Sequence, residues 1–448
     1  MGMEGILLEE EDAKDWVYRG EGAVNIVLGY IGSSPTFVGK VLRIQKVPKF
    51  KEKYTVGTSD FSVHEKILWK DSFDLDTCRS RDDAERLYVQ NVMIPLLGSE
   101  HVDAGVRVSV SRGFLEAIEK DHLCERPCWR VDAAKVNILC DSALLISDHI
   151  VFPDGIRKEV PCISVEIKPK WGCLPCSRFL AEGNALKRTI SRFRMHQALK
   201  LHRGETSGVS EYDPLDLFSG SIERISRALK SLFTTPQNNF RVFLNGNLIF
   251  GGLGGGTDDT TVKSNEAFED KIGDVIQAEY GQRKTEFLDL VSEAIFQSGV
   301  LNHLLEAQKR DFLDIEGAIH AYYNVISQPC RVCQDLGDNE LSQRYSSLHS
   351  LSSEESIEIV KGFLIAATAK DLSMMISFRP REEGDQVSSY NTILLDSTNQ
   401  LFEYKAYFID LDMKPLKKME YYYELDQKIV RCYNRLETAV HGFPDSQE

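Results

Sequence analysis

The N-terminal part of the chain alternates hydrophobic and polar positions, with glycine and proline between the runs. Residues 14–44 therefore predict three short strands, with a glycine-containing turn at 20–25 and a second turn at 32–35. The lysine-rich stretch 46–80 predicts a loop with a short helix inside it. Apolar residues at helical spacing over 83–96 predict a longer helix.

Strand-like runs return at 128–147 and 162–168. The change from apolar to polar residues at 147–149 predicts a boundary between two lobes. Residues 241–250 predict a hairpin, because the Asn-Gly pair in their middle suits a type I′ turn. Apolar residues at helical spacing predict helices at 184–203, 221–233, 265–277, 284–298, 300–308 and 354–369.

Three stretches of the second half predict irregular structure. Residues 251–261 are glycine-rich but lack the Gly-Lys-Ser/Thr ending of a P-loop, so they predict a flexible loop. Residues 380–400 are polar and predict loops, and the tail after Asn434 is expected to fray.

Composition narrows the class of protein. The 448 residues are enough for two or three domains, and 42% of them are hydrophobic, as in ordinary globular proteins. Lys plus Arg number 53 and Asp plus Glu number 68, which gives a net charge of −15. A general duplex-binding protein needs a basic surface, so we expect no nucleic-acid partner. A small polyanion needs only a local group of cations and stays possible.

Targeting signals are absent from the pattern. No run reaches the roughly 18 apolar residues of a membrane span, and the acidic N-terminus is unlike a signal peptide. Ile6 stands where a myristoylation signal needs Ser or Thr. The ten cysteines are therefore expected as thiols or metal ligands in a reducing compartment, the cytosol, the nucleus or both.

The turn that contains Gly20 and Gly22 is the first candidate site. Glycines between two strands let the backbone approach a triphosphate and donate N–H groups to it. A tight hairpin turn without any ligand explains the same residues. Lys40 and Arg43 on the next strand favour the nucleotide reading, because such residues can reach phosphates.

The run Glu166-Ile167-Lys168-Pro169-Lys170 is the second candidate. Alternation along a strand places Glu166, Lys168 and Lys170 on one face, and Pro169 ends the ladder. Two lysines aimed at phosphates, with a carboxylate beside them, would suit a nucleotide site. A solvated edge strand with one Glu–Lys pair is the alternative.

Basic residues also recur at helical spacing. Arg192, His196 and Lys200 predict one stripe, and Lys414, Lys418 and Tyr422 predict another on a helix whose first turn holds Pro415. Charged helix faces are usually only solvated. Two stripes together with the strand lysines strengthen the case for a polyanion site in an acidic protein.

A pair of aspartates could serve phosphoryl transfer. Asp410 follows an apolar strand, where a ligand for Mg²⁺ would lie, and Asp371 lies at a helix end. The reaction needs one carboxylate for the metal and another for the attacking hydroxyl. Asp410 as the N-cap of a following helix is the alternative.

Cysteine and histidine spacing predicts a structural zinc site. His320, Cys330, Cys333 and His349 form the pattern H-x9-C-x2-C-x15-H, a closed Cys₂His₂ set. Cys173 and Cys176, with histidines downstream, are a weaker candidate.

Together these residues resemble the inositol-pentakisphosphate 2-kinase family in its plant form. The resemblance rests on the E-x-K-P-K run at 166–170, on Ala369-Lys370-Asp371, on Phe408-Ile409-Asp410-Leu411 and on the His–Cys–Cys–His set. It spans nearly the whole chain. The P-x-x-x-D-x-K-x-G motif of the other inositol polyphosphate kinases is absent.

The resemblance implies an α/β (α+β), two-lobed, protein-kinase-like fold. An N-lobe at 1–149 would carry the glycine-rich nucleotide turn, and a C-lobe at 150–448 the inositol-phosphate and zinc regions. The activity implied is ATP- and Mg²⁺-dependent phosphorylation of the 2-hydroxyl of inositol pentakisphosphate, which gives inositol hexakisphosphate (phytate). We expect a monomer with this small-molecule substrate and no membrane partner.

The resemblance also implies roles for single residues. Asp371 would act on the substrate hydroxyl, Lys168 on the phosphates, and Asp410 would hold Mg²⁺. The residues implied to contact ATP are Gly22, Ala23, Val24, Asn25, Arg43, Ser147, Asp148, His149, Glu166, Lys168, Arg241 and Asp410. The residues implied to contact the inositol phosphate are Arg130, Lys170, His196, Lys200, Asn238, Asp371, Lys414, Lys418 and Tyr422.

The charges agree with such a substrate. Five phosphates at about −1.5 to −2 each carry about −7.5 to −10, which the predicted cations and Mg²⁺ approach. Two alternatives stay open: a kinase of another phosphorylated cyclitol, and an inositol-polyphosphate-binding scaffold without catalysis. The retained Asp371, Asp410 and Lys168 argue against the scaffold.

Overall fold

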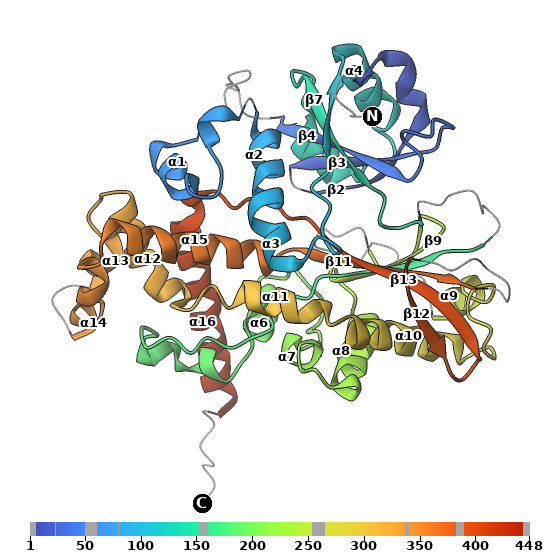
Figure 1. Cartoon of the computed structure of the whole chain (residues 1–448). Helices are drawn as coiled ribbons and strands as arrows, with labels where there is room; N and C mark the ends of the chain where they lie inside the picture. Colours follow the sequence, from blue (N-terminus) through green and yellow to red (C-terminus); the bar gives the residue numbers. More distant parts are fainter. Residues whose placement is uncertain are drawn as a thin grey trace, which may run out of the picture.

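Two β-sheets with helices packed around them form the framework of the chain (Figure 1). The computed structural model describes residues 6–22, 24–49, 61–78, 80–152, 160–252, 265–336, 340–381 and 389–441. The chain is thus a mixed α/β protein with two sheets, as the α+β class predicted. No helix in the described part is both long and apolar enough to cross a bilayer.

The seven-stranded sheet, the core of what we call the smaller lobe, is built from the N-terminal third of the chain, at the top of Figure 1. Its strand order is β1-β5-β7-β4-β3-β2, and β6 pairs with β4. Alternating residues such as Trp16, Leu28 and Leu42 face a core that α4 covers. The bounds are β1 (Leu7–Leu8), β2 (Trp16–Glu21), β3 (Asn25–Tyr30), β4 (Lys40–Pro48), β5 (Val106–Val110), β6 (Ala134–Val136) and β7 (Ser142–Ser147).

The six-stranded sheet, the core of the larger lobe, lies below it, in the order β10-β9-β8-β11-β13-β12. Strand β8 runs antiparallel to both β9 and β11, and all five of its residues are buried. The E-x-K-P-K run therefore begins at the end of a central strand and continues beyond it, and the edge-strand alternative is wrong. The bounds are β8 (Ile163–Ile167), β9 (Phe240–Leu244), β10 (Asn247–Phe250), β11 (Ser373–Pro380), β12 (Asn391–Leu395) and β13 (Gln400–Ile409).

Helices cover both sheets, and three of them connect the lobes. Trp69 on α1, Tyr88 on α2, Met93 in the π-helical turn that follows α2, and Leu97 on α3 belong to the hydrophobic cluster of the larger lobe. The division of the chain at residue 149 stays a prediction. The helices are α1 (Val63–Trp69), α2 (Arg81–Tyr88), α3 (Ile94–Leu97), α4 (Arg112–Asp121), α5 (Cys128–Ala133), α6 (Arg192–His202), α7 (Pro214–Leu217), α8 (Ile222–Thr234), α9 (Asn265–Lys271), α10 (Arg283–Ser298), α11 (Val300–Gln308), α12 (Asp314–Val325), α13 (Arg331–Leu336), α14 (Glu340–His349), α15 (Ser353–Ala369) and α16 (Met419–His441).

Several predicted elements are confirmed. The three N-terminal strands, the short helix within 46–80 and the helices starting near residues 221, 284, 300 and 354 are present. The hairpin β9–β10 turns through Asn245 at φ 49° and Gly246 at φ 80°. Both residues are left-handed, as a type I′ turn requires. The glycine run beyond Gly252 lies outside the described residues.

Other predictions were wrong in detail. The start of the predicted strand 128–147 is the helix α5. The predicted helix 184–203 is a 3-10 segment (Glu182–Arg188) followed by α6, because the Ser191 hydroxyl caps a new helix N-terminus. The helix expected to reach 277 ends at Lys271. The polar stretch 380–400 contains β12, and α16 continues past Asn434.

Candidate active site

A pocket opens between the two sheets, where the smaller lobe meets the end of β13. Its apolar walls come from β3, β4 and β7 above, and from Met375 and Phe408 below. Most residues implied to contact ATP are brought together here, whereas Ala23 lies outside the described residues. The implied residues that line the pocket are Gly22, Val24, Asn25, Arg43, Ser147, Asp148, His149 and Asp410.

Arg43 is held in the pocket by acidic partners that the sequence analysis missed. Its guanidinium pairs with Asp412, and Glu85 on α2 lies 3.7 Å away. The Asn25 amide, turned with its oxygen toward Arg43, accepts from Nε at 2.8 Å. Burial disfavours the charge, but the two acids outweigh it and raise the pKa of Arg43. The spacing Asp410-Leu411-Asp412 was the available signal for Asp412.

The segment that joins the lobes at the pocket is fixed by hydrogen bonds. Asp103 accepts from the backbone N–H of Ser147 at 2.9 Å and of Gly105 at 2.8 Å. The ring of His149 stacks on Tyr407 with 4.0 Å between centroids. Burial, with Lys405 and Lys40 nearby, lowers the pKa of His149 to about 3, so the ring is neutral. A flat, neutral surface of this kind suits the packing of a nucleotide's adenine base.

Glu166, Lys168 and Arg241 lie beside the pocket at the end of β8. Arg241 donates to Glu166 at 3.2 Å, and the Ser373 hydroxyl donates to the same carboxylate at 2.9 Å. Lys168 donates to Asp410 at 3.3 Å. Burial disfavours the ammonium, but Asp410 and Glu166 outweigh it and raise the pKa of Lys168. These cations are therefore charged and paired.

Asp410 projects from the end of β13 in a left-handed conformation, with φ 63°. The 3-10 turn that precedes α16 has Pro415 as its N-cap residue, so the N-cap alternative for Asp410 is wrong. The side chain is 55% exposed. Burial of the site opposes ionisation, but Lys168 and Arg43 prevail and hold the pKa of Asp410 below its usual range.

Asp371 follows the C-terminus of α15, as predicted, and Lys414 donates to it at 2.7 Å. Lys414 does not lie on a helix, because it precedes the 3-10 turn Leu416–Lys418 and α16 begins at Met419. The predicted stripe of Lys414, Lys418 and Tyr422 is therefore wrong as a helix face. All three residues nevertheless interact with Asp371: Lys414 donates to it, and its charge acts on the pKa values of Lys418 and Tyr422. Burial disfavours the Asp371 carboxylate, but Lys414 and Lys170 lower its pKa.

Further cations lie within electrostatic reach of Asp371. Lys170, at φ 62°, interacts with Lys168 and with the α6 residues His196 and Lys200. Burial, followed by repulsion from Lys168, lowers the pKa of Lys170 to about 8. Burial, with Arg192, Lys200 and Lys170 nearby, lowers the pKa of His196 to about 3. These groups repel one another, which is typical of a site built for an anion.

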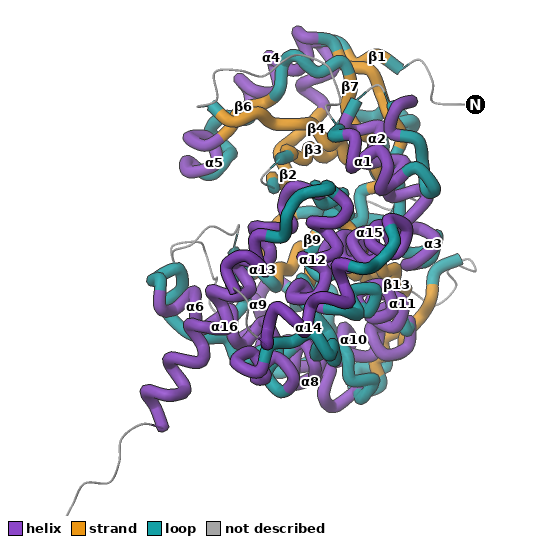
Figure 2. The backbone as a smooth tube through the Cα atoms, turned by 90° about the vertical axis from the view of Figure 1, so that its left-hand side faces the viewer, coloured by secondary structure: helices purple, strands orange, loops and turns teal. Residues whose placement is uncertain are grey.

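The remaining residues implied for the substrate frame this cation group. Burial and the neighbouring Lys414 lower the pKa of Lys418, and burial with Asp371 raises that of Tyr422. Arg130 comes from the smaller lobe, on α5, which lies on the same side of the molecule as α6 (Figure 2). Asn238 is exposed in the turn before β9, next to Asn239, whose carbonyl accepts from Lys168 N–H.

Comparison with known proteins identifies the family. The family model for inositol-pentakisphosphate 2-kinase matches residues 18–428. The chain belongs to this family. The inositol-pentakisphosphate 2-kinase of Arabidopsis thaliana is 53% identical over 437 residues, covering 97% of this chain and 96% of the relative. That of Oryza sativa subsp. indica is 53% identical over 430 residues, covering 96% of each. The Danio rerio enzyme is 30% identical, covering 96% of this chain and 95% of its own.

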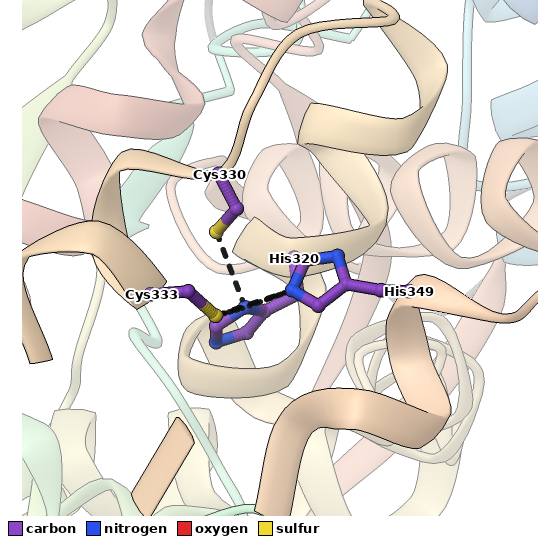
Figure 3. A group of neighbouring side chains, drawn as sticks. All are labelled: His320, Cys330, Cys333 and His349. Carbon is purple, nitrogen blue, oxygen red and sulfur yellow. Dashed lines mark hydrogen bonds between the residues drawn. The ribbon is translucent and has the colours of Figure 1, made fainter. Parts of the chain in front are cut away.

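This member of the inositol-pentakisphosphate 2-kinase family also carries a compact histidine–cysteine cluster, none of whose residues lines the pocket (Figure 3). His320 lies on α12, Cys330 immediately precedes α13, Cys333 lies on α13, and His349 ends α14. His320 Nδ1 lies 3.3 Å from Cys330 Sγ, 3.4 Å from Cys333 Sγ and 3.2 Å from His349 Nε2. A tetrahedral zinc with these ligands has edges of about 3.3–3.8 Å, so the donor set fits the ion.

Two further features bear on the metal prediction. Asn324 Oδ1 lies 3.3 Å from His349 Nδ1, which leaves Nε2 facing the cluster and fixes the ring. The weaker candidate with Cys173 and Cys176 gains no support. The Cys173 thiol instead accepts from the Trp171 indole at 3.2 Å, and neither cysteine belongs to a metal-like group within the described residues.

Proposed function

We infer that this protein phosphorylates the 2-hydroxyl of inositol pentakisphosphate with ATP, giving inositol hexakisphosphate and ADP. One observation supports this most directly. Asp371 interacts electrostatically both with Lys168, which pairs with Asp410 of the pocket, and with Lys170, one of a group of mutually repelling cations. A nucleotide and a polyanionic acceptor would therefore meet at one carboxylate. A singly phosphorylated acceptor would leave most of these cations without an anion.

We propose that the pocket holds ATP in a two-lobed, kinase-like arrangement. The base would lie between the sheets near His149, and the backbone around Gly22 would approach the phosphates. Arg43, Lys168 and Arg241 would neutralise the phosphate charge, since a phosphoryl group in transfer spreads negative charge over its oxygens. Glu166 would hold Arg241 in place and contact the ribose edge.

Asp410 fits the role of a magnesium ligand. Hard oxygen donors suit Mg²⁺, and one carboxylate with phosphate oxygens and waters is a usual set. The hydrogen bonds that Asp410 accepts from Lys168 and Ser373 both end on Oδ2, which leaves Oδ1 for a cation. Bound Mg²⁺ would neutralise charge on the transferred phosphoryl group. Asp410 would fix where it binds.

Asp371 would orient the acceptor hydroxyl and take its proton. The oxygen–phosphorus bond to the 2-position forms as the bond to the β-phosphate breaks, and the proton passes to a carboxylate oxygen of Asp371. The lowered pKa of Asp371 keeps that carboxylate ionised for the task. Lys414, which pairs with it, would turn toward an acceptor phosphate when the substrate binds.

We propose that the remaining predicted residues hold the other phosphates. Lys170, Lys200 and His196 would approach from the floor of the larger lobe, and Arg130 from the smaller lobe. Lys418, Tyr422 and Asn238 would complete the rim. Each offers a donor to phosphate oxygens, and charge-assisted bonds of this kind are the strong ones.

We also propose that His320, Cys330, Cys333 and His349 hold a structural zinc. Four protein ligands close the coordination shell, so the ion would join α12, α13 and α14 without any part in transfer. Thiolate ligands persist in reducing compartments, which supports a place in the cytosol or nucleus. We propose a monomer without a nucleic-acid partner, in keeping with the net charge of −15; sedimentation and filter binding would test this.

Transfer of labelled γ-phosphate tests the function directly. Purified protein with Mg²⁺ and inositol pentakisphosphate vacant at the 2-position should give labelled hexakisphosphate. Pentakisphosphates vacant at other positions, and inositol monophosphates, should give little product. Tight binding of the pentakisphosphate without any transfer would support the scaffold alternative, and transfer to monophosphates would support another kinase.

A further inference from the structure

Glu21, the last residue of β2, is a buried carboxylate in the glycine turn, between Gly20 and Gly22. Its side chain is 1% exposed, and it accepts from Lys46 and Arg126, which are also 1% exposed. Arg126 binds it through Nε at 2.9 Å and Nη2 at 3.2 Å. None of these three residues lines the nucleotide pocket. A buried charge that the reaction does not use requires another explanation.

Arg126 holds helix α5 from both ends. It lies two residues before the helix, and its Nη2 donates to the carbonyl of Ala134, the residue after the helix, at 2.8 Å. Its Nη1 donates to Glu119 at 3.2 Å. The helix itself has only six residues and no side-chain N-cap. Isolated helices of this length are unstable, so the contacts with Arg126 determine its position.

Helix α5 carries Trp129 and Arg130. The Arg130 guanidinium lies over the Trp129 ring, 4.0 Å from its centroid. Burial, outweighing attraction to Glu21 and joined by repulsion from Arg241, lowers the pKa of Arg130. Arg130 therefore lies within electrostatic reach both of Glu21 in the smaller lobe and of Arg241 in the larger one.

Lys46 holds the glycine turn from the other side of Glu21. Its ammonium donates to the carbonyl of Gly22 at 2.7 Å, in addition to its ion pair with Glu21. Its backbone N–H donates to the carbonyl of Val24 at 2.7 Å. Both ends of the turn are thus tied to Lys46, and Lys46 is tied to the carboxylate that also holds Arg126.

We propose that Glu21 is a positioning residue that joins the nucleotide turn to the helix carrying Arg130. The proposal rests on the roles proposed above for the turn and for Arg130. Removing the charge of Glu21 would leave Lys46 and Arg126 buried without their carboxylate, and both would move toward water. The turn and α5 would then lose their anchors together.

This connection makes the two ligands cooperate. A nucleotide that orders the glycine turn fixes Glu21, which in turn fixes Arg126 and α5. Pentakisphosphate bound to Arg130 in turn raises the affinity for the nucleotide by the same factor, because coupling between two bound ligands is reciprocal. Glu21 does not line the pocket, so it would act through the turn and α5, on the affinity for each ligand and on the coupling between them.

Calorimetric binding to the full-length protein tests the proposal. The probes are inositol pentakisphosphate, titrated with and without a non-hydrolysable ATP analogue and Mg²⁺. In the wild type we expect the analogue to tighten pentakisphosphate binding about 5-fold or more. Glu21→Gln should reduce that factor to about 1 and weaken each ligand alone by about 3–10-fold. Wild-type affinities and an unchanged factor in this variant would overturn the proposal.

Two further variants keep the result interpretable. Glu116→Gln, on the exposed face of α4 where Glu116 pairs with Arg112 at 2.7 Å, removes the same charge in the same lobe and should change nothing. If Glu21→Gln fails to fold, Arg126→Lys keeps the charge but loses the bond to Ala134, and should weaken the pentakisphosphate more than the analogue. Equal weakening of both ligands would then overturn the proposal.

The proposed role of Arg130 is tested separately. Arg130→Ala should weaken pentakisphosphate binding and leave the analogue bound. Unchanged pentakisphosphate affinity in Arg130→Ala contradicts the substrate role itself. Weakened affinity there, together with wild-type behaviour of Glu21→Gln, contradicts only the positioning role of Glu21.

Discussion

The nucleotide side and the acceptor side of the candidate site differ in whether their cations are paired with carboxylates. On the nucleotide side, Arg43 is paired with Asp412, Arg241 with Glu166, and Lys168 with Asp410. On the acceptor side, Lys170, Lys200 and His196 lie near one another with no ion pair among the described residues. The pKa of Lys168 is accordingly raised, whereas that of Lys170 is lowered to about 8.

The difference indicates what each side does before its ligand binds. Paired charges stay in place and shape the pocket, so the nucleotide meets a formed site. Cations that repel one another store an unfavourable energy that only an anion relieves. With the proposed roles, the acceptor side would select ligands by total charge, and the nucleotide side by shape.

The largest expected effect comes from the carboxylate between the two sides. Asp371→Asn should lower kcat by about 10²- to 10⁴-fold, the usual contribution of a positioned base. The affinity for inositol hexakisphosphate should stay within about threefold, because the variant releases Lys414 for phosphate. Rapid-quench transfer and calorimetric binding measure the two quantities. The matched control is Asp76→Asn, which removes an exposed acid paired with Lys66. A normal kcat in Asp371→Asn would exclude Asp371 from the mechanism.

A smaller effect should separate the cations of the two sides. Lys170→Met should raise KM for the pentakisphosphate about 10–100-fold, as expected for a charge-assisted bond of about 1.5–3 kcal/mol, with KM for ATP nearly unchanged. Lys168→Met should chiefly impair ATP use and kcat. Exposed Lys418 should contribute less, about 3–10-fold in Lys418→Met. Steady-state kinetics with each substrate varied would contradict the comparison if Lys170→Met changed KM for ATP instead.

The lowered pKa of Lys170 should appear in the pH dependence of binding. The anion favours the charged ammonium, so the bound pKa lies above the free value of about 8. Affinity is therefore full below pH 8 and falls as the pH rises from about 8 toward the bound pKa. Calorimetry near pH 8.5 in two buffers of different ionisation enthalpy should detect proton uptake. Lys170→Arg should abolish this uptake, and equal uptake in both proteins would assign it elsewhere.

The histidine–cysteine cluster should affect neither side. Cys330→Ala should lose the zinc and lower the melting temperature by about 5 °C or more, with kcat/KM of the folded protein within about twofold. Metal analysis and thermal melts measure the change, with exposed Cys124→Ala as the control. One equivalent of zinc retained in Cys330→Ala would contradict the ligand assignment.

Local patterns in the sequence predicted the parts of the fold that depend on near neighbours. The alternation of hydrophobic and polar residues predicted the strands β2, β3 and β4, and the Asn-Gly pair predicted the turn of the hairpin β9–β10. The helix α5 was misjudged because its position depends on Arg126 and a distant carboxylate. Lys414 was misjudged because helical spacing alone does not show where a helix begins.

The sequence by itself determined the chemistry of this protein: which side chains can hold phosphates, and which acids can serve a transfer. Those residue types and spacings are local properties of the chain. Only the tertiary structure decided which charges meet, since Arg43 and Asp412 lie 369 positions apart. The same is true of the left-handed backbone at Lys170 and Asp410, and of the shared burial of Glu21, Lys46 and Arg126. Burial and pairing set the charge on each group, and both arise only when distant segments pack together.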